Sequence, residues 1–121
     1  GIFGINYSDN DYRLKNIMQL LEDNLDIIIL TEDESSQDEV MNILSKTDKF
    51  TKSNKVLHIS YRSVAIENAI NIMNHDDTLL ILGKGNEKFL SMAFGKERYN
   101  GDKYYAIKYL NKRKEFENET I

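Results

Sequence analysis

The sequence contains no cysteine, so disulfide bonds and thiolate chemistry are excluded, and this composition fits a reducing compartment. It has no apolar run of the ~20 residues that a membrane-spanning helix needs, and its beginning lacks the charged-then-apolar pattern of a signal peptide. A basic surplus is also missing, because the net charge is −4. We therefore expect neither a membrane nor nucleic acid as a partner. Proline is absent too, and we attach no functional meaning to its absence.

The length of 121 residues predicts a single domain, residues 1–121. A chain of this size can bury about two-thirds of its unfolded surface, which is enough for a substantial core. The chain begins at Gly1 and not at a methionine, from which we expect it to be a piece of a longer protein.

Short apolar runs alternate with amphipathic helical patterns along the chain, which predicts an α/β fold. Right-handed crossovers between successive strands would give a mostly parallel sheet with helices on both faces. Phe94-Gly95-Lys96, flanked by Phe89–Met92 and by Arg98–Tyr99, predicts a small hairpin or antiparallel edge strand near the carboxyl terminus. The expected strands are residues 1–5, 26–31, 55–60 and 78–82.

The helices are inferred from apolar residues that recur at spacings of three and four. Ser60 and Asp102 stand where N-caps are favoured, and the charged tail from Lys112 onward is expected to fray. The side chains expected to be buried on the helices are Leu14, Ile17, Met18, Leu21, Val40, Ile43, Leu44, Val64, Ile66, Ala69, Ile70, Met73, Tyr105, Ala106, Tyr109 and Leu110.

The most informative segment is Thr-Leu-Leu-Ile-Leu-Gly-Lys-Gly-Asn-Glu, residues 78–87. An apolar strand ends abruptly at Gly83-Lys84-Gly85, and Glu87 follows. Two glycines at this point allow a sharp turn and a close approach of the backbone to a ligand. Ligands of open α/β sheets bind at the carboxyl ends of the strands. An ordinary strand-to-loop turn would have the same pattern, so this segment alone leaves both readings open.

The loops after the expected strands would share one edge of the sheet. They carry an excess of carboxylates and a few cations, which suits an ammonium group or a metal–nucleotide. The alternative is that these loops are the solvated surface of an acidic protein. The charged residues gathered there are Asp9, Asp11, Glu32, Asp33, Glu34, Arg62, Lys84 and Glu87.

Several catalytic motifs are missing. The chain has no Gly-x-x-x-x-Gly-Lys-Ser/Thr phosphate loop, no Gly-x-Gly-x-x-Gly after its first strand, and no Gly-x-Ser-x-Gly elbow. His58 and His75 have no cysteine or second histidine at ligand spacing, so we expect no zinc site and no other metal site. The chain alone does not have the residues of a complete enzyme.

The order of the motifs resembles the carboxy-terminal domain of the Mur ligases over nearly the whole chain. The family's Gly-Lys-Gly-His-Glu stands here as residues 83–87, and its Asp-Arg-Ala-Glu-Ala-Ile helix start stands as residues 61–66. The early Gly-Asp-Arg-Asp segment is present as residues 8–11, with Lys15 and Met18 in register, and the Asp-Asp before the last helix as Gly101-Asp102. The chain is most similar to the ligases that add the third residue to the peptidoglycan stem peptide.

The resemblance implies a Rossmann-like three-layer fold in a cytoplasmic protein, and a division of labour between domains. In such ligases an amino-terminal domain holds the UDP-sugar, UDP-N-acetylmuramoyl-L-alanyl-D-glutamate, and a central domain holds ATP and Mg²⁺. The third domain closes over them and brings in the amino acid. On this basis Gly83 and Glu87 would contact the incoming amino acid. The residues that would face the nucleotide are Asp9, Asp11, Lys15 and Arg62.

The departures from the family pattern bear on the amino acid. Ligases that add diaminopimelate carry Asp-Asn-Pro-Arg after the second strand, where this chain has Asp33-Glu34-Ser35-Ser36. Serine cannot supply the arginine's planar grip on a distal carboxylate, whereas an acidic loop favours a side chain that ends in an ammonium. We therefore expect Asp33 and Glu34 to favour L-lysine. Asn86 and Asn10 also replace a histidine and an arginine of the family.

Other functions fit the same residues. The chain could be a non-catalytic α/β module that binds a small ligand at this edge, or part of a related amide ligase of the folylpolyglutamate type. The acidic rim disfavours the second, because incoming glutamate would be repelled. A Gly-Lys-Thr/Ser phosphate loop encoded upstream of Gly1 would favour the Mur-type ligase, and its absence the binding module.

Overall fold

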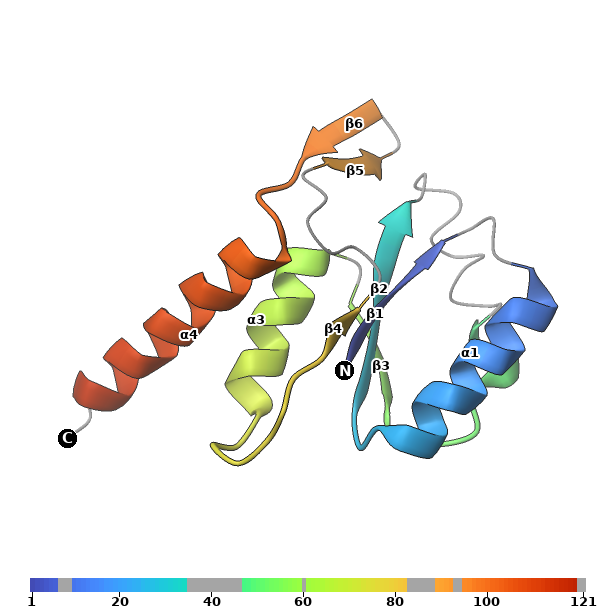
Figure 1. Cartoon of the computed structure of the whole chain (residues 1–121), viewed down its shortest axis with the longest axis horizontal. Coiled ribbons are helices and arrows are strands. Elements are labelled where there is room, and N and C mark those ends of the chain that lie inside the picture. Colours follow the sequence, from blue (N-terminus) through green and yellow to red (C-terminus); the bar gives the residue numbers. More distant parts are fainter. Residues whose placement is uncertain (7–9, 35–46, 60, 83–88, 93–94, 120–121) are drawn as a thin grey trace.

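The computed structural model describes residues 1–6, 10–34, 47–59, 61–82, 89–92 and 95–119. Strands and helices alternate along the first two-thirds of the chain, and a hairpin and a long helix follow (Figure 1). The elements are β1 (Ile2–Asn6), α1 (Asp11–Asn24), β2 (Ile28–Glu34), β3 (Val56–His58), α3 (Arg62–Ile72), β4 (Ile81–Leu82), β5 (Phe89–Met92), β6 (Gly95–Arg98) and α4 (Asp102–Glu119). Residues 47–50 are also helical.

The strands form one sheet in the order β4-β1-β2-β5-β6, and β3 pairs with β2 as well. β3 pairs with residues 28–30 of β2, whereas β5 pairs with β2 at its last residue, Glu34↔Ser91. All these pairings are parallel except that of β5 with β6, which is antiparallel. The predicted α/β class, with a mostly parallel sheet and an antiparallel hairpin near the end, is therefore confirmed.

Both faces of the sheet are covered, α1 lying on one side and α3 with α4 on the other (Figure 1). Along β2, Ile28 and Leu30 pack under α1, while Ile29 between them packs under α3. Successive strand residues point to opposite faces, so a strand covered on both sides needs an uninterrupted apolar run. The core under α1 consists of Leu14, Met18, Leu21, Ile28 and Leu30, and that under α3 of Ile2, Ile29, Ala65, Ile66, Ala69 and Ile70.

Helix α1 forms as its sequence predicts. The Asn10 side chain accepts a hydrogen bond from the backbone N–H of Arg13 at 2.8 Å, which caps the helix. At the other end of the helix, the Glu22 carboxylate accepts hydrogen bonds from the backbone N–H groups of Lys52 and Ser53, each at 3.0 Å. These bonds tie α1 to the loop that precedes β3.

Helices α3 and α4 differ from expectation at their ends. The N-cap of α3 is Tyr61, which makes no side-chain capping bond, so the prediction of Ser60 as the cap is wrong. The tail from Lys112 is helical as far as Glu119 and not frayed. The Arg113 side chain explains this, because its Nη1 donates to the carbonyl oxygens of Ile70 and Met73 at 2.6 Å and binds α4 to the end of α3.

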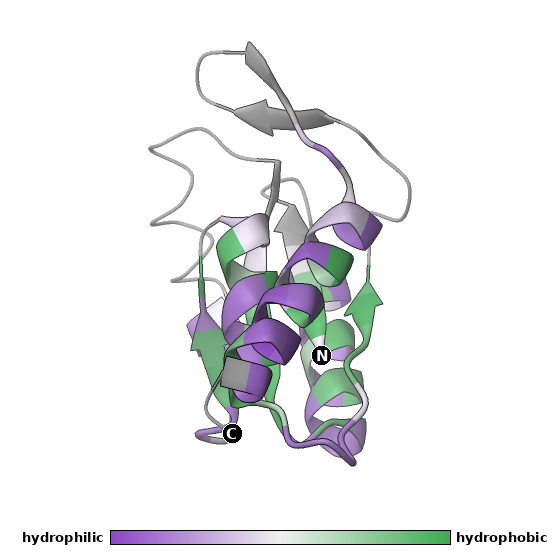
Figure 2. Ribbon diagram, turned by 90° about the vertical axis from the view of Figure 1, so that its left-hand side faces the viewer, coloured by the Kyte–Doolittle hydropathy of each residue, from purple (hydrophilic) through white to green (hydrophobic). Residues whose placement is uncertain are grey.

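Two side chains expected in the core are exposed. Val64 on α3 is 42% exposed and Leu110 on α4 is 48% exposed. Their helical positions fall beside the buried stripe and not on it, and α4 packs on α3 through Tyr105, Ala106 and Tyr109. Figure 2 shows the consequence, since α4 is largely hydrophilic on the side that faces the viewer, whereas the strands behind it are hydrophobic.

The strand bounds also differ from expectation. β4 is shorter than the predicted 78–82, and β2 begins later than predicted and continues to Glu34. The acidic residues 32–34 extend the strand because β1 pairs with them, at Ile5↔Glu32 and Asn6↔Glu34. The predicted helix with Val40, Ile43 and Leu44 lies outside the described residues.

None of the helices within the described ranges combines the length and hydropathy needed to cross a bilayer.

Replacing Leu14 by alanine is expected to lower the free energy of unfolding by about 2–5 kcal/mol, because its fully buried side chain leaves a cavity under α1. Leu20→Ala is the matched control on the same helix. Its side chain is 65% exposed, so the loss should stay within about 0.5 kcal/mol. Urea unfolding followed by circular dichroism measures both, and equal losses would contradict the assignment of the core.

Candidate functional site

The carboxyl ends of the parallel strands lie together at one edge of the sheet. β1 ends at Asn6, β2 at Glu34 and β4 at Leu82, and the β5–β6 hairpin lies beyond the same edge (Figure 1). Ligands bind at this edge in open α/β sheets. Of the residues predicted for this edge, Asp9, Gly83, Lys84 and Glu87 lie outside the described residues.

Asp33 and Glu34 are the last two residues of β2 and do not lie in a loop, where they were expected. The pairing of β1 with β2 shifts register between Ile5 and Asn6, so that Asp33 is the extra residue on β2. Such bulges are common beside active sites, where they redirect the chain. Glu34 is backbone-paired on both sides, to Asn6 of β1 and to Ser91 of β5.

Asp11 and Lys15 lie in the first turns of α1, both with exposed side chains. Because α1 follows β1, its amino-terminal end lies at the carboxyl edge of the sheet. The geometry thus places these residues at the predicted edge, and their role toward a nucleotide stays a prediction.

Arg62, also predicted to face a nucleotide, is instead fully buried at the start of α3, where it pairs with a carboxylate. Its Nε donates to Oδ1 of Asp102 at 2.7 Å and its Nη2 to Oδ2 at 2.9 Å. Nη2 also donates to the carbonyl oxygen of Leu82, the last residue of β4, at 2.9 Å. The Tyr99 hydroxyl donates to Oδ1 of Asp102. We call Arg62, Tyr99 and Asp102 the buried cluster.

The buried cluster explains the start of α4. Asp102 was expected to cap this helix, and it is the first helical residue, with its carboxylate bound to Arg62. The preceding Gly101 has a φ of 103°, a conformation that favours glycine. Sequence reasoning missed Tyr99 and the pairing of Arg62 with Asp102. The sequence did contain one signal for a buried, paired Arg62, because this arginine begins a helix whose next turns are apolar.

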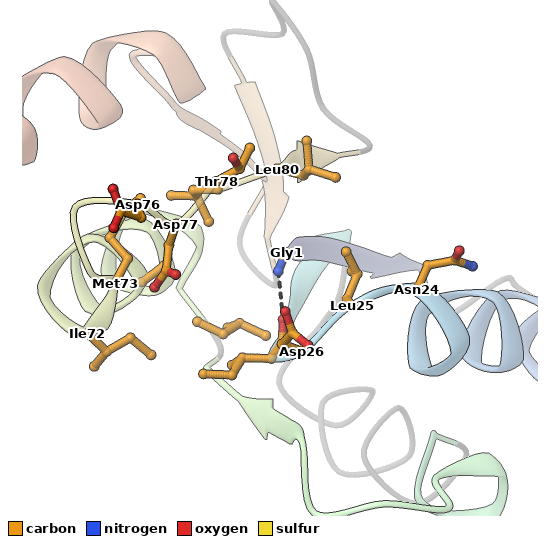
Figure 3. Close-up of a pocket in the computed structure, with 14 residues that line it drawn as sticks. Gly1, Asn24, Leu25, Asp26, Ile72, Met73, Asp76, Asp77, Thr78 and Leu80 are labelled. Atoms are coloured by element: carbon orange, nitrogen blue, oxygen red, sulfur yellow. Dashed lines mark hydrogen bonds between the residues drawn. The ribbon is translucent and has the colours of Figure 1, made fainter.

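A cavity of about 430 Å³ lies at the opposite, amino-terminal end of the strands (Figure 3). Gly1, Asp26, Asp76 and Asp77 line it, with apolar side chains from α3. The Gly1 amino group donates to the carbonyl oxygen of Ile27 at 2.7 Å across its wall. This cavity is not at the ligand-binding edge of such sheets, so it is not our candidate. Among the described residues no group of three or more His, Cys, Asp or Glu could hold a metal ion.

Asp102→Ala is expected to lower the free energy of unfolding by about 3–5 kcal/mol, because it leaves the buried Arg62 charge without its carboxylate. Glu117→Ala removes the carboxylate from Arg113 in a more exposed pair of α4, where the loss should be below about 1 kcal/mol. Thermal or urea unfolding of the two variants tests the contrast. Similar losses of unfolding free energy in the two variants would mean that the buried cluster stabilises the fold no more than the more exposed Arg113–Glu117 pair does.

Burial, followed by the hydrogen bond to Asp102, raises the pKa of Tyr99 above its ordinary value of 10.0. Above that pH the unfolded chain binds fewer protons than the folded one, so the contribution of Tyr99 to stability is present below it and is lost as the pH rises. The free energy of unfolding should therefore fall in alkali. Tyr99→Phe should make this fall less steep, as measured by urea unfolding at several alkaline pH values. An unchanged slope would contradict the assignment.

Comparison with known proteins shows which proteins the chain is similar to. No family model matches the sequence. A UDP-N-acetylmuramyl-tripeptide synthetase of Limosilactobacillus reuteri is 30% identical over 95 residues, which cover 76% of this chain and 18% of that protein. A UDP-N-acetylmuramoyl-L-alanyl-D-glutamate--2,6-diaminopimelate ligase of Fusobacterium nucleatum is 34% identical over 119 residues, which cover 97% of this chain and 24% of that protein.

The fold is shared with a solved structure of the same kind of ligase. A UDP-N-acetylmuramoyl-L-alanyl-D-glutamate--2,6-diaminopimelate ligase superposes with a TM-score of 0.82 at 18% identity, over 93% of this chain and 23% of that one. This chain therefore spans about a quarter or less of the length of the proteins that it matches. Sequence and fold together identify it as a homologue of part of the Mur ligases.

Proposed function

We propose that residues 1–121 are the carboxy-terminal domain of an ATP-dependent amide-forming ligase of peptidoglycan synthesis. The domain would bind the incoming amino acid, which the ligase adds as the third residue to UDP-N-acetylmuramoyl-L-alanyl-D-glutamate. The observation that carries this proposal is the match over 97% of the chain to a protein named for that reaction. A regulatory or ligand-binding module would also fit the fold, but it would not account for the named relatives.

The division of labour between domains supports this assignment. The chain has no phosphate loop, and it spans about a quarter or less of its relatives, so ATP and Mg²⁺ would be held mainly by other domains. ATP would convert the acceptor carboxylate into an acyl phosphate, and the amine of the amino acid would displace the phosphate to form the amide. Lys15 is exposed at the carboxyl edge of the sheet, and we propose that it faces the nucleotide together with Asp9 and Asp11.

Arg62 fits the nucleotide role less well. Its side chain has no exposed surface, and its donors bind Asp102 and Leu82. A nucleotide phosphate could reach this guanidinium only if the buried cluster opened.

The strand order supports a binding site for the amino acid near Asp33 and Glu34. β4 and β5 lie on opposite sides of the β1–β2 pair; β4 ends at Leu82, and β5 begins at Phe89. These two residues bound the segment that carries Gly83 and Glu87. We propose that the Gly83 carbonyl and the Glu87 carboxylate hold the far end of the amino acid. One charge-assisted hydrogen bond of this kind contributes roughly 1.5–3 kcal/mol.

We propose L-lysine as the amino acid. The support is Ser36 in place of the arginine that grips diaminopimelate in similar ligases, together with the carboxylates of Asp33 and Glu34. Diaminopimelate is the second candidate, because three of the relatives are named for it. The two substrates differ by a carboxylate at the far end, which an acidic site would repel.

The decisive experiment is amino-acid-dependent release of ADP by the longer protein that contains this chain, supplied with UDP-N-acetylmuramoyl-L-alanyl-D-glutamate. We expect turnover with lysine to exceed turnover with diaminopimelate by about tenfold or more, the value of one charge-assisted bond. Faster turnover with diaminopimelate would refute only the assignment of lysine and not the assignment of a ligase. No release with either amino acid would refute the ligase and favour the binding module.

Glu87→Gln tests the role of the carboxylate in the same assay. It should raise the KM for lysine by about tenfold and leave the KM for ATP unchanged, because it removes the charge but keeps the shape of the side chain. Residues 1–121 alone are expected to show no ATP hydrolysis. Turnover by this piece would contradict the proposed division between domains.

A further inference from the structure

The buried cluster and Leu82 bring together three parts of the chain that are distant in sequence. Arg62 begins α3, Leu82 ends β4, Tyr99 follows β6, and Asp102 begins α4. Arg62, Tyr99 and Asp102 are 1%, 2% and 7% exposed. The cluster therefore fixes the carboxyl end of β4 relative to both helices on this face and to the end of the hairpin.

Stability alone does not account for such an arrangement. Well-packed apolar side chains often stabilise a core as much as a buried ion pair does, because two charges must first lose their water. A guanidinium adds directional geometry, since its planar fork meets both carboxylate oxygens in one orientation. In that orientation Nη2 also reaches the Leu82 carbonyl. The ion pair thus sets the position of a backbone group and not only the packing of two helices.

Besides the bond from Arg62, β4 is held by its pairing with β1 and by Ile81, which packs against the core under α3. It contains 2 residues and pairs in the described sheet with β1 on one side, at Ile2↔Ile81 and Phe3↔Leu82. The bond from Arg62 holds its last carbonyl on the side of α3. Gly83 is the next residue along the chain.

We propose that Arg62, Tyr99 and Asp102 are positioning residues for the incoming amino acid. They act without touching it, by holding the end of β4 from which the segment with Gly83 and Glu87 departs. This inference rests on the proposed function for its consequence in catalysis. It assigns Arg62 a role through Leu82 in place of direct contact with nucleotide.

The kinetic test uses Arg62→Lys and Tyr99→Phe in the longer ligase. Lysine keeps the charge but cannot bind Asp102 in a bidentate manner and also reach Leu82. We expect Arg62→Lys to raise the KM for the amino acid by about tenfold, with the KM for ATP within about twofold of wild type. Tyr99→Phe, which leaves the ion pair intact, should have a smaller effect in the same direction.

Arg113→Lys and Tyr109→Phe are the matched controls. Arg113 also donates to backbone carbonyls of this helix pair, but at the far end of α3, and Tyr109 packs against α3 outside the buried cluster. They should lower stability without changing either KM. An Arg62→Lys effect on the KM for ATP would instead support direct nucleotide contact and overturn the positioning role. Equal effects of Arg62→Lys and Arg113→Lys on the amino-acid KM would overturn it as well.

Hydrogen exchange separates this inference from the proposed function, because it needs no activity. In the 121-residue chain, Arg62→Lys should speed amide exchange across residues 82–88 more than Arg113→Lys does, under conditions in which both variants are folded. Equal exchange in the two variants overturns the positioning role. A wild-type ligase that releases no ADP with any amino acid overturns the proposed function, and the catalytic consequence of positioning with it.

Discussion

The burial of β2 on both faces is the constraint on which the rest of the structure depends. Ile28 and Leu30 pack under α1 and Ile29 under α3, so the strand forms part of both cores. β2 also pairs with β1, with β3 over its first residues and with β5 at its last. Each layer of the fold is therefore built against the seven residues of β2, and the last of them, Glu34, pairs with the hairpin at the ligand-binding edge.

Local pattern was sufficient to predict the architecture. The apolar run of β2 and the helical spacing of Leu14, Met18 and Leu21 each carry their signal within a few residues. The alternation of the two kinds of element then limits the topology to a mostly parallel sheet. The hairpin was predicted from Phe94-Gly95-Lys96 and the residues on either side of it, and in the structure the second strand of the hairpin begins at Gly95.

The site could be predicted only as far as the edge of the sheet. That edge follows from topology, but the pairing of Arg62 with Asp102 joins residues 40 positions apart, and no local pattern contains it. The extension of β2 into acidic residues was missed for a similar reason, because the pairing partner β1 overrides their low strand propensity. The continuation of α4 past Lys112 likewise depends on Arg113 meeting the end of another helix.

The short strand β4 has a consequence for handling the chain in isolation. In the described sheet it is an edge strand, and Leu80 and Leu82 are 45% and 37% exposed there. Residues 78–82 carry no charge that would oppose a second strand. An uncharged, apolar open edge of this kind is a template for intermolecular strand pairing. Concentrated preparations of this chain should self-associate along β4, and a lysine placed on that edge strand would oppose the association.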